Sequence, residues 1–77
     1  MQTEFEGHYY STVCASDLQR DGMGLELRCD SLLIAEIFFF DTTGQFTISL
    51  FKQSIPLSVI EQFIAEARTN LIPIVSN

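Results

Sequence analysis

Apolar and polar residues alternate along most of the chain, a pattern that predicts half-buried β-strands. The first segment, from Thr3 to about Leu18, is rich in β-branched and aromatic residues. We therefore expect one long, bent strand there, with a bulge at Gly7. Asp21-Gly22 then indicates a tight hairpin turn. The pattern predicts that a second, antiparallel strand follows this turn.

A turn centred on Asp21-Gly22 determines how the two strands pair. Leu18 then faces Leu25, and Cys14 faces Cys29. This pairing collects apolar side chains on one face and charged side chains on the other. A slip of one residue would exchange the faces, so the clean separation supports the register.

A third strand is expected from Leu33 to Phe40, after a loop at Asp30–Leu32. With this loop, Leu27 pairs with Ala35 and the apolar face stays continuous. The third strand therefore extends the sheet beside the second one.

The turn Asp41–Gly44 is compatible with two registers. A four-residue loop pairs Phe39 with Phe46 and leaves Glu36 on the polar, outer face. A three-residue loop with a bulge at its glycine instead places Glu36 beside Leu50, among apolar residues. Burying an unpaired carboxylate is expensive. We therefore prefer the four-residue loop.

The last segment has apolar residues at helical spacing and predicts a helix. Pro56 suits the first helical position. A capping box formed by Ser58 and Glu61 would instead start the helix two residues later. Pro73 prevents continuation beyond about Ile72. The apolar stripe consists of Leu57, Ile60, Phe63, Ile64, Ala67 and Leu71.

These elements predict an α+β fold: a four-stranded antiparallel β-meander with one C-terminal helix packed on one face. A chain of 77 residues suffices for a single domain, residues 1–77, with a marginal core. The net charge of −6 argues against nucleic acids and anionic membranes as partners. We find no signal-peptide pattern and no apolar run long enough to span a membrane, so we expect a cytoplasmic protein.

The outer face of the sheet, which the single helix leaves uncovered, is the feature that bears most on function. A contiguous apolar patch there would be unusual for a monomer. We interpret it as an interface, and homodimerisation is the commonest way to cover such a face. The alternative is that the N-terminal arm folds over it. The predicted interface consists of Ile34, Glu36, Phe38, Phe40, Thr47 and Phe51.

Glu26 and Glu36 face each other in the predicted pairing, on the outer face. Like charges opposed across strands are destabilising. One interpretation is a cation site. The other, which we favour, is that Arg28 neutralises the pair, because two carboxylates alone make a poor metal site.

Cys14 opposite Cys29 suggests either a redox pair or two small buried residues. We favour the second interpretation because free cysteine is usually buried. His8 is the single histidine, and no nucleophile lies at a diagnostic spacing from it. Two cysteines and one histidine also fall short of a structural zinc site. We therefore expect no catalytic residue, no metal and no cofactor.

The second half of the chain resembles a group of small, uncharacterised bacterial proteins that fold as a β-meander followed by a helix. The likeness covers about residues 35–68. It is carried by Ala35-Glu36-Ile37-Phe38, Asp41-Thr42-Thr43-Gly44, Phe46-Thr47-Ile48-Ser49, Ile55-Pro56-Leu57, Ile60-Glu61, Phe63-Ile64 and Glu66-Ala67. The resemblance implies this fold and little about activity. Some similar-looking small acidic proteins serve as immunity proteins beside secreted toxins, and that role brings no catalytic residue with it.

Together these observations predict a small, acidic, non-enzymatic interaction domain. We expect a homodimer formed through the outer sheet face, with acidic surfaces available to neutralise a basic protein such as a toxin. The alternative is a domain that binds a small ligand or a metal at a site near His8, Glu26 and Glu36.

Overall fold

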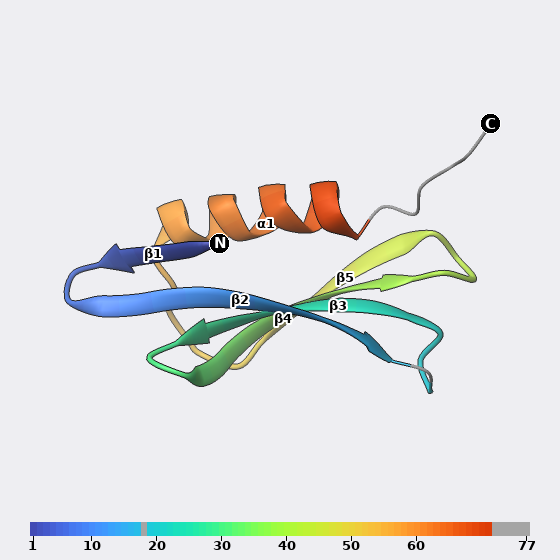
Figure 1. Cartoon of the computed structure of the whole chain (residues 1–77), viewed down its shortest axis with the longest axis horizontal. Coiled ribbons are helices and arrows are strands. Elements are labelled where there is room, and N and C mark those ends of the chain that lie inside the picture. Colours follow the sequence, from blue (N-terminus) through green and yellow to red (C-terminus); the bar gives the residue numbers. More distant parts are fainter. Residues whose placement is uncertain (18, 72–77) are drawn as a thin grey trace.

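The computed structural model of the chain describes residues 1–17 and 19–71, and Figure 1 shows an antiparallel sheet with one helix beside it. The elements are β1 (Gln2–Phe5), β2 (His8–Asp17), β3 (Gly22–Cys29), β4 (Leu32–Phe40), β5 (Gln45–Leu50) and α1 (Leu57–Asn70). The strand order is β1-β2-β3-β4-β5, so each strand pairs with its neighbours in sequence. The α+β class, the antiparallel meander and the C-terminal helix are confirmed. The sheet has five strands, however, and not four.

The additional strand arises because the chain reverses direction at Glu6-Gly7. The φ angles of these residues are 50° and 80°, as a two-residue type I′ turn requires. Gly7 adopts this conformation without steric cost, so it is a turn residue and not the predicted bulge. β1 pairs with β2 from Gln2 opposite Ser11 onwards. The N-terminal segment thus widens the sheet at one edge and does not lie across its outer face.

The register between β2 and β3 differs from the prediction. Cys14 faces Leu25, four positions earlier in β3 than the predicted partner Cys29. Asp17 pairs with Gly22, so the connection between β2 and β3 is longer than the predicted two-residue turn. The predicted partner of Leu25, Leu18, lies outside the described residues. A shift by an even number of residues keeps every side chain on its face. Leu25 consequently stays in the core, where it is 1% exposed.

A two-residue turn also joins β3 to β4, where the sequence predicted a three-residue loop. Cys29 pairs with Leu32, and Asp30 and Ser31 lie between them with φ angles of 50° and 73°. A left-handed conformation costs a residue other than glycine about 1–2 kcal/mol. The Asp30 N–H donates to the carbonyl oxygen of Tyr9 over 2.8 Å, which ties this turn to β2.

A β-bulge in β4 restores the predicted register after this shorter turn. Arg28 pairs with Leu33 and Leu27 pairs with Ala35, which leaves Ile34 as an extra residue. Ile34 is 5% exposed and belongs to the core cluster. Its predicted place on the outer face is therefore wrong, because the bulge turns this side chain to the inner face.

The four-residue loop at Asp41–Gly44 is confirmed. Phe39 pairs with Phe46, and Phe40 pairs with Gln45. The N–H of Gly44, whose φ is 69°, donates to the carbonyl oxygen of Phe40 over 2.8 Å. The apolar residues of β4 and β5 therefore lie on the inner face in the predicted alignment.

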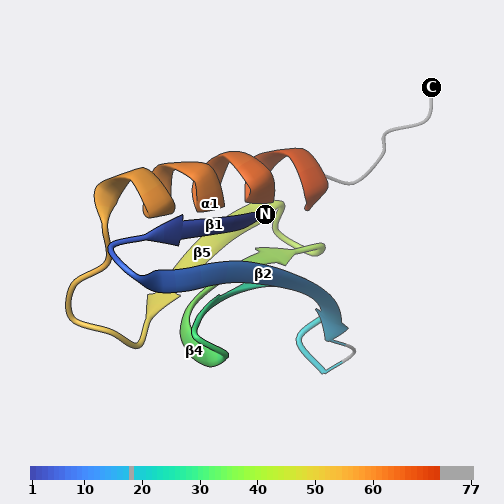
Figure 2. The same ribbon diagram turned by 60° about the vertical axis from the view of Figure 1, so that its left-hand side comes forward.

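α1 runs alongside β1 above the inner face of the curved sheet, as both Figure 1 and Figure 2 show. Pro56 is the N-cap residue, one position before the helix, and no side chain caps this end. The helix starts at Leu57, so neither predicted start is confirmed. It ends at Asn70, and Pro73 lies outside the described residues. The described residues include no helix with the length and apolarity needed to cross a membrane.

The buried side of α1 is rotated relative to the predicted stripe. Val59 and Phe63 are 1% and 0% exposed, whereas Leu57 and Ile64 are 72% and 38% exposed. Residues four apart on a helix share a face, so Val59, Phe63 and Ala67 form the buried row. The core cluster consists of Tyr10, Leu25, Leu27, Cys29, Ile34, Ala35, Ile37, Phe39, Val59, Phe63, Ala67 and Leu71.

Two glycines of β3 make room for a phenylalanine of β4. Gly24 pairs with Phe38, whose side chain is 2% exposed. A Cβ on Gly24 would lie 3.2 Å from Cδ2 of Phe38. A Cβ on Gly22 would overlap the Phe39 carbonyl oxygen and lie 2.7 Å from Cε1 of Phe38. The ring therefore occupies space that a side chain at either position would fill.

We predict that Gly22→Ala lowers the free energy of unfolding by about 3 kcal/mol, because the new methyl group forces apart two packed strands. Gly44→Ala is the control: nothing lies within 4 Å of a Cβ there, so only its positive φ matters, at about 1 kcal/mol. Urea denaturation measures both changes. Equal losses in the two variants would contradict the packing explanation.

Candidate functional site

Phe38, the central aromatic residue of the predicted interface, is covered by other residues of the chain. The guanidinium carbon of Arg20 lies 4.0 Å from the centroid of the Phe38 ring. Phe40 packs edge-on against the same ring, at a centroid distance of 4.8 Å. A cation placed over an aromatic face is attracted to the ring, and here it also shields the ring from water. Phe38 is therefore a buried residue on the outer face and not an exposed anchor.

Two carboxylates hold Arg20 in this position. Its Nη1 and Nη2 atoms donate to the two oxygens of Glu36, both over 3.0 Å, and its Nε donates to Asp17 over 2.6 Å. Such fork-like pairs are the strongest type of arginine contact. The hydrogen bond from Arg20 lowers the pKa of Asp17. The hydrogen bonds to Glu36, and secondarily to Asp17, raise the pKa of Arg20.

Glu26 and Glu36 face each other as predicted, and each has its own arginine. Arg28 donates to Glu26 over 2.8 Å, which confirms the predicted neutralisation for this carboxylate. Glu36 is paired with Arg20 instead. The sequence interpretation missed this pair because it placed the β2–β3 turn two residues too late.

The six residues of the predicted interface do not form one exposed surface. Ile34 lies in the core and Phe38 is covered, while Phe40 and Glu36 are half-buried. Thr47 is exposed on β5, and Phe51, directly after β5, is 60% exposed.

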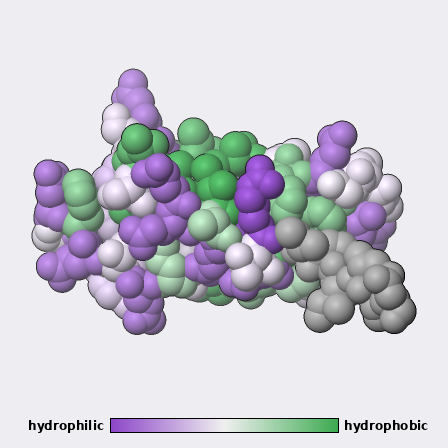
Figure 3. Space-filling view, turned by 90° about the horizontal axis from the view of Figure 1, so that it is seen from above, coloured by the Kyte–Doolittle hydropathy of each residue, from purple (hydrophilic) through white to green (hydrophobic). Residues whose placement is uncertain are grey.

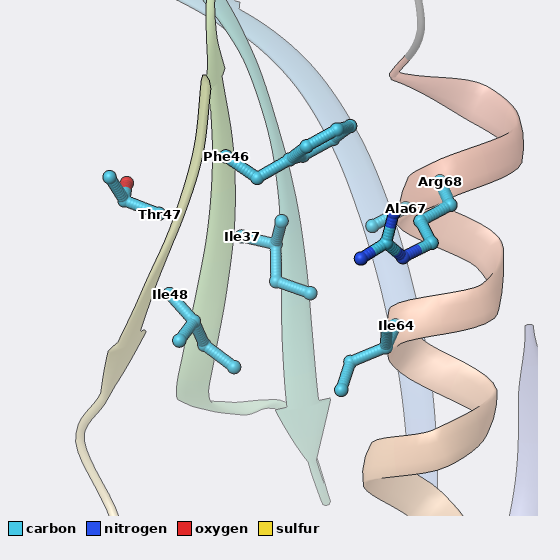
Figure 4. A pocket seen from close by; sticks show the side chains of 7 residues that line it. All are labelled: Ile37, Phe46, Thr47, Ile48, Ile64, Ala67 and Arg68. Carbon is cyan, nitrogen blue, oxygen red and sulfur yellow. The ribbon is translucent and has the colours of Figure 1, made fainter.

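Exposed apolar side chains gather instead between β5 and α1. Ile48 and Leu50 of β5 are 48% and 59% exposed, although both belong to the inner face. Figure 4 shows Ile48, Ile37 and Ile64 directed into the space between β5 and α1, and Thr47 directed away from it. This space is a cleft of about 160 Å³. In Figure 3, which looks onto the helix side, hydrophobic residues form a patch bordered by polar ones.

β5 is an edge strand, and its residues Gln45–Leu50 include no charge and no proline. It pairs with β4 only. Natural edge strands are usually protected by charges, prolines, bulges or short length, because free backbone groups promote pairing with other chains. β1, the opposite edge, is only four residues long and contains Glu4. We call the free edge of β5, together with Phe46, Ile48 and Leu50, the β5 flank.

His8 lies far from the two glutamates with which the sequence grouped it. It starts β2, whereas Glu26 pairs with Val13, five residues further along β2 or roughly 16 Å away. His8 Nδ1 instead forms a 2.7 Å hydrogen bond with Asp30. This bond and the Tyr9 N–H lower the pKa of Asp30. His8, Glu26 and Glu36 therefore do not form one site.

The two cysteines are separated as well. Both are free; Cys14 is exposed and pairs with Leu25, whereas Cys29 is buried and pairs with Tyr10. The predicted pairing of the cysteines is wrong, because it depended on the Asp21-Gly22 turn. Burial, followed by a hydrogen bond with the Cys29 side chain, raises the pKa of the Tyr10 hydroxyl.

No family model, curated protein or solved structure matches this chain. The resemblance to small bacterial β-meander-plus-helix proteins, and through some of them to toxin immunity, therefore stays a prediction.

The contacts of Arg20 predict that the stability of the folded chain depends on pH through Asp17, and that Arg20→Met removes this dependence. In the native chain the folded-state pKa of Asp17 lies below its ordinary value of 3.8. Asp17 therefore contributes stability above that value, and the contribution is lost as the pH falls through the folded pKa. In Arg20→Met the Asp17 pKa should rise toward the ordinary value. NMR titration of the carboxyl carbons measures it directly.

Arg28→Met is the matched control for this prediction, because it removes the arginine of Glu26 and leaves Arg20 in place. Its Asp17 pKa should stay low. An Asp17 pKa that is the same in the native chain and in Arg20→Met would contradict the assigned cause.

Proposed function

We propose that the protein is a non-enzymatic interaction domain that assembles as a homodimer, in which two copies pair through their β5 flanks. The observation that carries this proposal is an uncharged edge strand whose inner side is apolar and exposed. A strand of this kind is a template for pairing with another strand. A chain of 77 residues also has a small core and gains stability from additional buried surface.

The alternation of β5 selects one register for the pair. Residues directly opposite in antiparallel strands point to the same face. A two-fold axis through Ile48 places Ile48 opposite the partner's Ile48, and Phe46 opposite the partner's Leu50. All apolar residues of both strands then lie on one inner face, while Thr47 and the partner's Ser49 share the outer face. Symmetric pairings centred on Thr47 or Ser49 leave one of the three apolar residues without an apolar partner.

Light scattering after size-exclusion chromatography tests this assembly. The native chain should be a dimer, and Ile48→Lys should raise its dissociation constant by about 100-fold or more, because two ammonium groups would meet at the axis. Val13→Lys is the control: Val13 is 47% exposed on the outer face, opposite Glu26. It should not affect the dimer.

These variants separate the possible outcomes. A native monomer, or an Ile48→Lys chain that remains dimeric, would overturn the proposal. If Val13→Lys dissociated the dimer and Ile48→Lys did not, the interface would lie on the outer face and not at the β5 flank. Circular dichroism confirms that both variants are folded, as expected for substitutions of exposed side chains.

A cross-link tests the register. In a Cys14→Ser background, Ile48→Cys places two thiols across the axis, at a Cβ separation of about 4.5–5.5 Å, so mild oxidation should give a covalent dimer. Ser49→Cys places its thiols roughly 8 Å apart and should not cross-link. Efficient cross-linking through Ser49→Cys instead would show a different register.

A further inference from the structure

Two turns at one end of the sheet bring together three side chains of the types that bind metal ions. His8 directly follows the Glu6-Gly7 turn, while Cys29 and Asp30 lie at the β3–β4 turn. The imidazole nitrogen, the thiol sulfur and a carboxylate oxygen all lie within 4.8 Å of one another. The pairing of Cys29 with Tyr10 is what places the thiol beside this histidine.

The distances are close to those of a tetrahedral site. His8 Nδ1 lies 2.7 Å from Oδ2 of Asp30, and Cys29 Sγ lies 3.9 Å from the same oxygen. Nitrogen, sulfur and oxygen ligands around one zinc ion lie about 3.3–3.6 Å apart. Adjustments of about 1 Å therefore suffice. His8 and Asp30 can make them, because their side chains are 54% and 50% exposed.

Hydrogen bonds outside the cluster already orient it. The Tyr9 N–H donates to Oδ1 of Asp30 over 2.9 Å, which leaves Oδ2 directed toward His8 and Cys29. Cys29 is 6% exposed and fixed in the β2–β3 ladder opposite Tyr10. Such supporting contacts fix the orientation of ligands in known metal sites.

Solvent reaches the cluster from one side. A cleft of about 400 Å³ adjoins it, and its lining includes Glu6, His8, Tyr10 and Lys52. Three protein ligands leave one position of a tetrahedral ion for water or for a small ligand. Of the three residues of the cluster, His8 lines this cleft.

We propose that His8, Cys29 and Asp30 bind one zinc ion, or a chemically similar divalent transition-metal ion. A set of one nitrogen, one sulfur and one oxygen ligand suits this class, whereas calcium and magnesium ions prefer oxygen ligands throughout. The bound ion would join the β1–β2 turn to the β3–β4 turn and so stabilise this end of the sheet. The site uses no residue of the β5 flank, so it is independent of the proposed homodimer.

Titration of the reduced, metal-free protein with Co²⁺ tests the site. We expect one Co²⁺ per chain, with the near-ultraviolet sulfur-to-cobalt charge-transfer band and the visible bands of tetrahedral cobalt. Zn²⁺ should displace the cobalt and abolish both. Excess Zn²⁺ should also raise the melting temperature, because the ion binds the folded state.

Variants assign the ligands. Cys29→Ser should abolish the charge-transfer band, whereas Cys14→Ser, at the exposed cysteine, should retain it. His8→Gln and Asp30→Asn should each weaken Co²⁺ binding tenfold or more. Because His8 is an exposed residue, His8→Gln tests the proposal even if Cys29→Ser does not fold.

The contrary results are equally specific. Absence of the charge-transfer band in the native protein, its loss in Cys14→Ser, or full-strength binding by His8→Gln would each overturn the proposed site. Ile48→Lys should bind Co²⁺ like the native chain, which separates this test from that of the dimer.

Discussion

One helix is too narrow to cover a five-stranded sheet. A helix is about 10 Å wide with its side chains, while five strands spaced about 4.8 Å apart span roughly 19 Å. α1 is drawn to the β2 side, where Thr12 Oγ1 donates to the Glu66 carboxylate over 2.8 Å. The inner face is therefore sealed beneath the helix and open at β5. The exposure of Ile48 and Leu50 follows from this width limit and from the side on which the helix is anchored.

The sequence predicted the faces of the strands more reliably than their alignment. Strand alternation detects a slip of one residue, because that slip exchanges inside and outside. It does not detect a slip of two or four, which preserves every face. The pairing of β4 with β5 was predicted correctly because the competing register would have buried Glu36. For the pairing of β2 with β3, no wrong register carried such a penalty. The prediction rested on Asp21-Gly22 as a turn signal, but Gly22 belongs to β3, where its missing side chain makes room for Phe38.

The error in alignment also explains which site features the sequence could not reveal. With Cys29 placed opposite Cys14, the thiol was separated from His8, and Asp30 was assigned to a loop without partners. Arg20 directly precedes the predicted Asp21-Gly22 turn, and the predicted pairing gave no reason to place it beside Glu36 or Phe38. Each of these contacts joins residues from different strands or loops, so each depends on the length of one connection. The opposition of Glu26 and Glu36 was predictable because it depends only on β3 and β4.

The short first strand has a consequence for how large an assembly can become. If two sheets join through β5, both outer edges of the combined sheet are β1 strands. Each β1 strand has four residues, which include Glu4. Such an edge offers few backbone groups to any further chain, and pairing with it would bring that chain against the exposed carboxylate of Glu4. Growth would then stop at two copies, and the assembly would be a closed dimer. A sheet with two edges able to pair would instead extend into a fibre. The turn at Glu6-Gly7 that creates β1 would thus act as the terminator of the sheet.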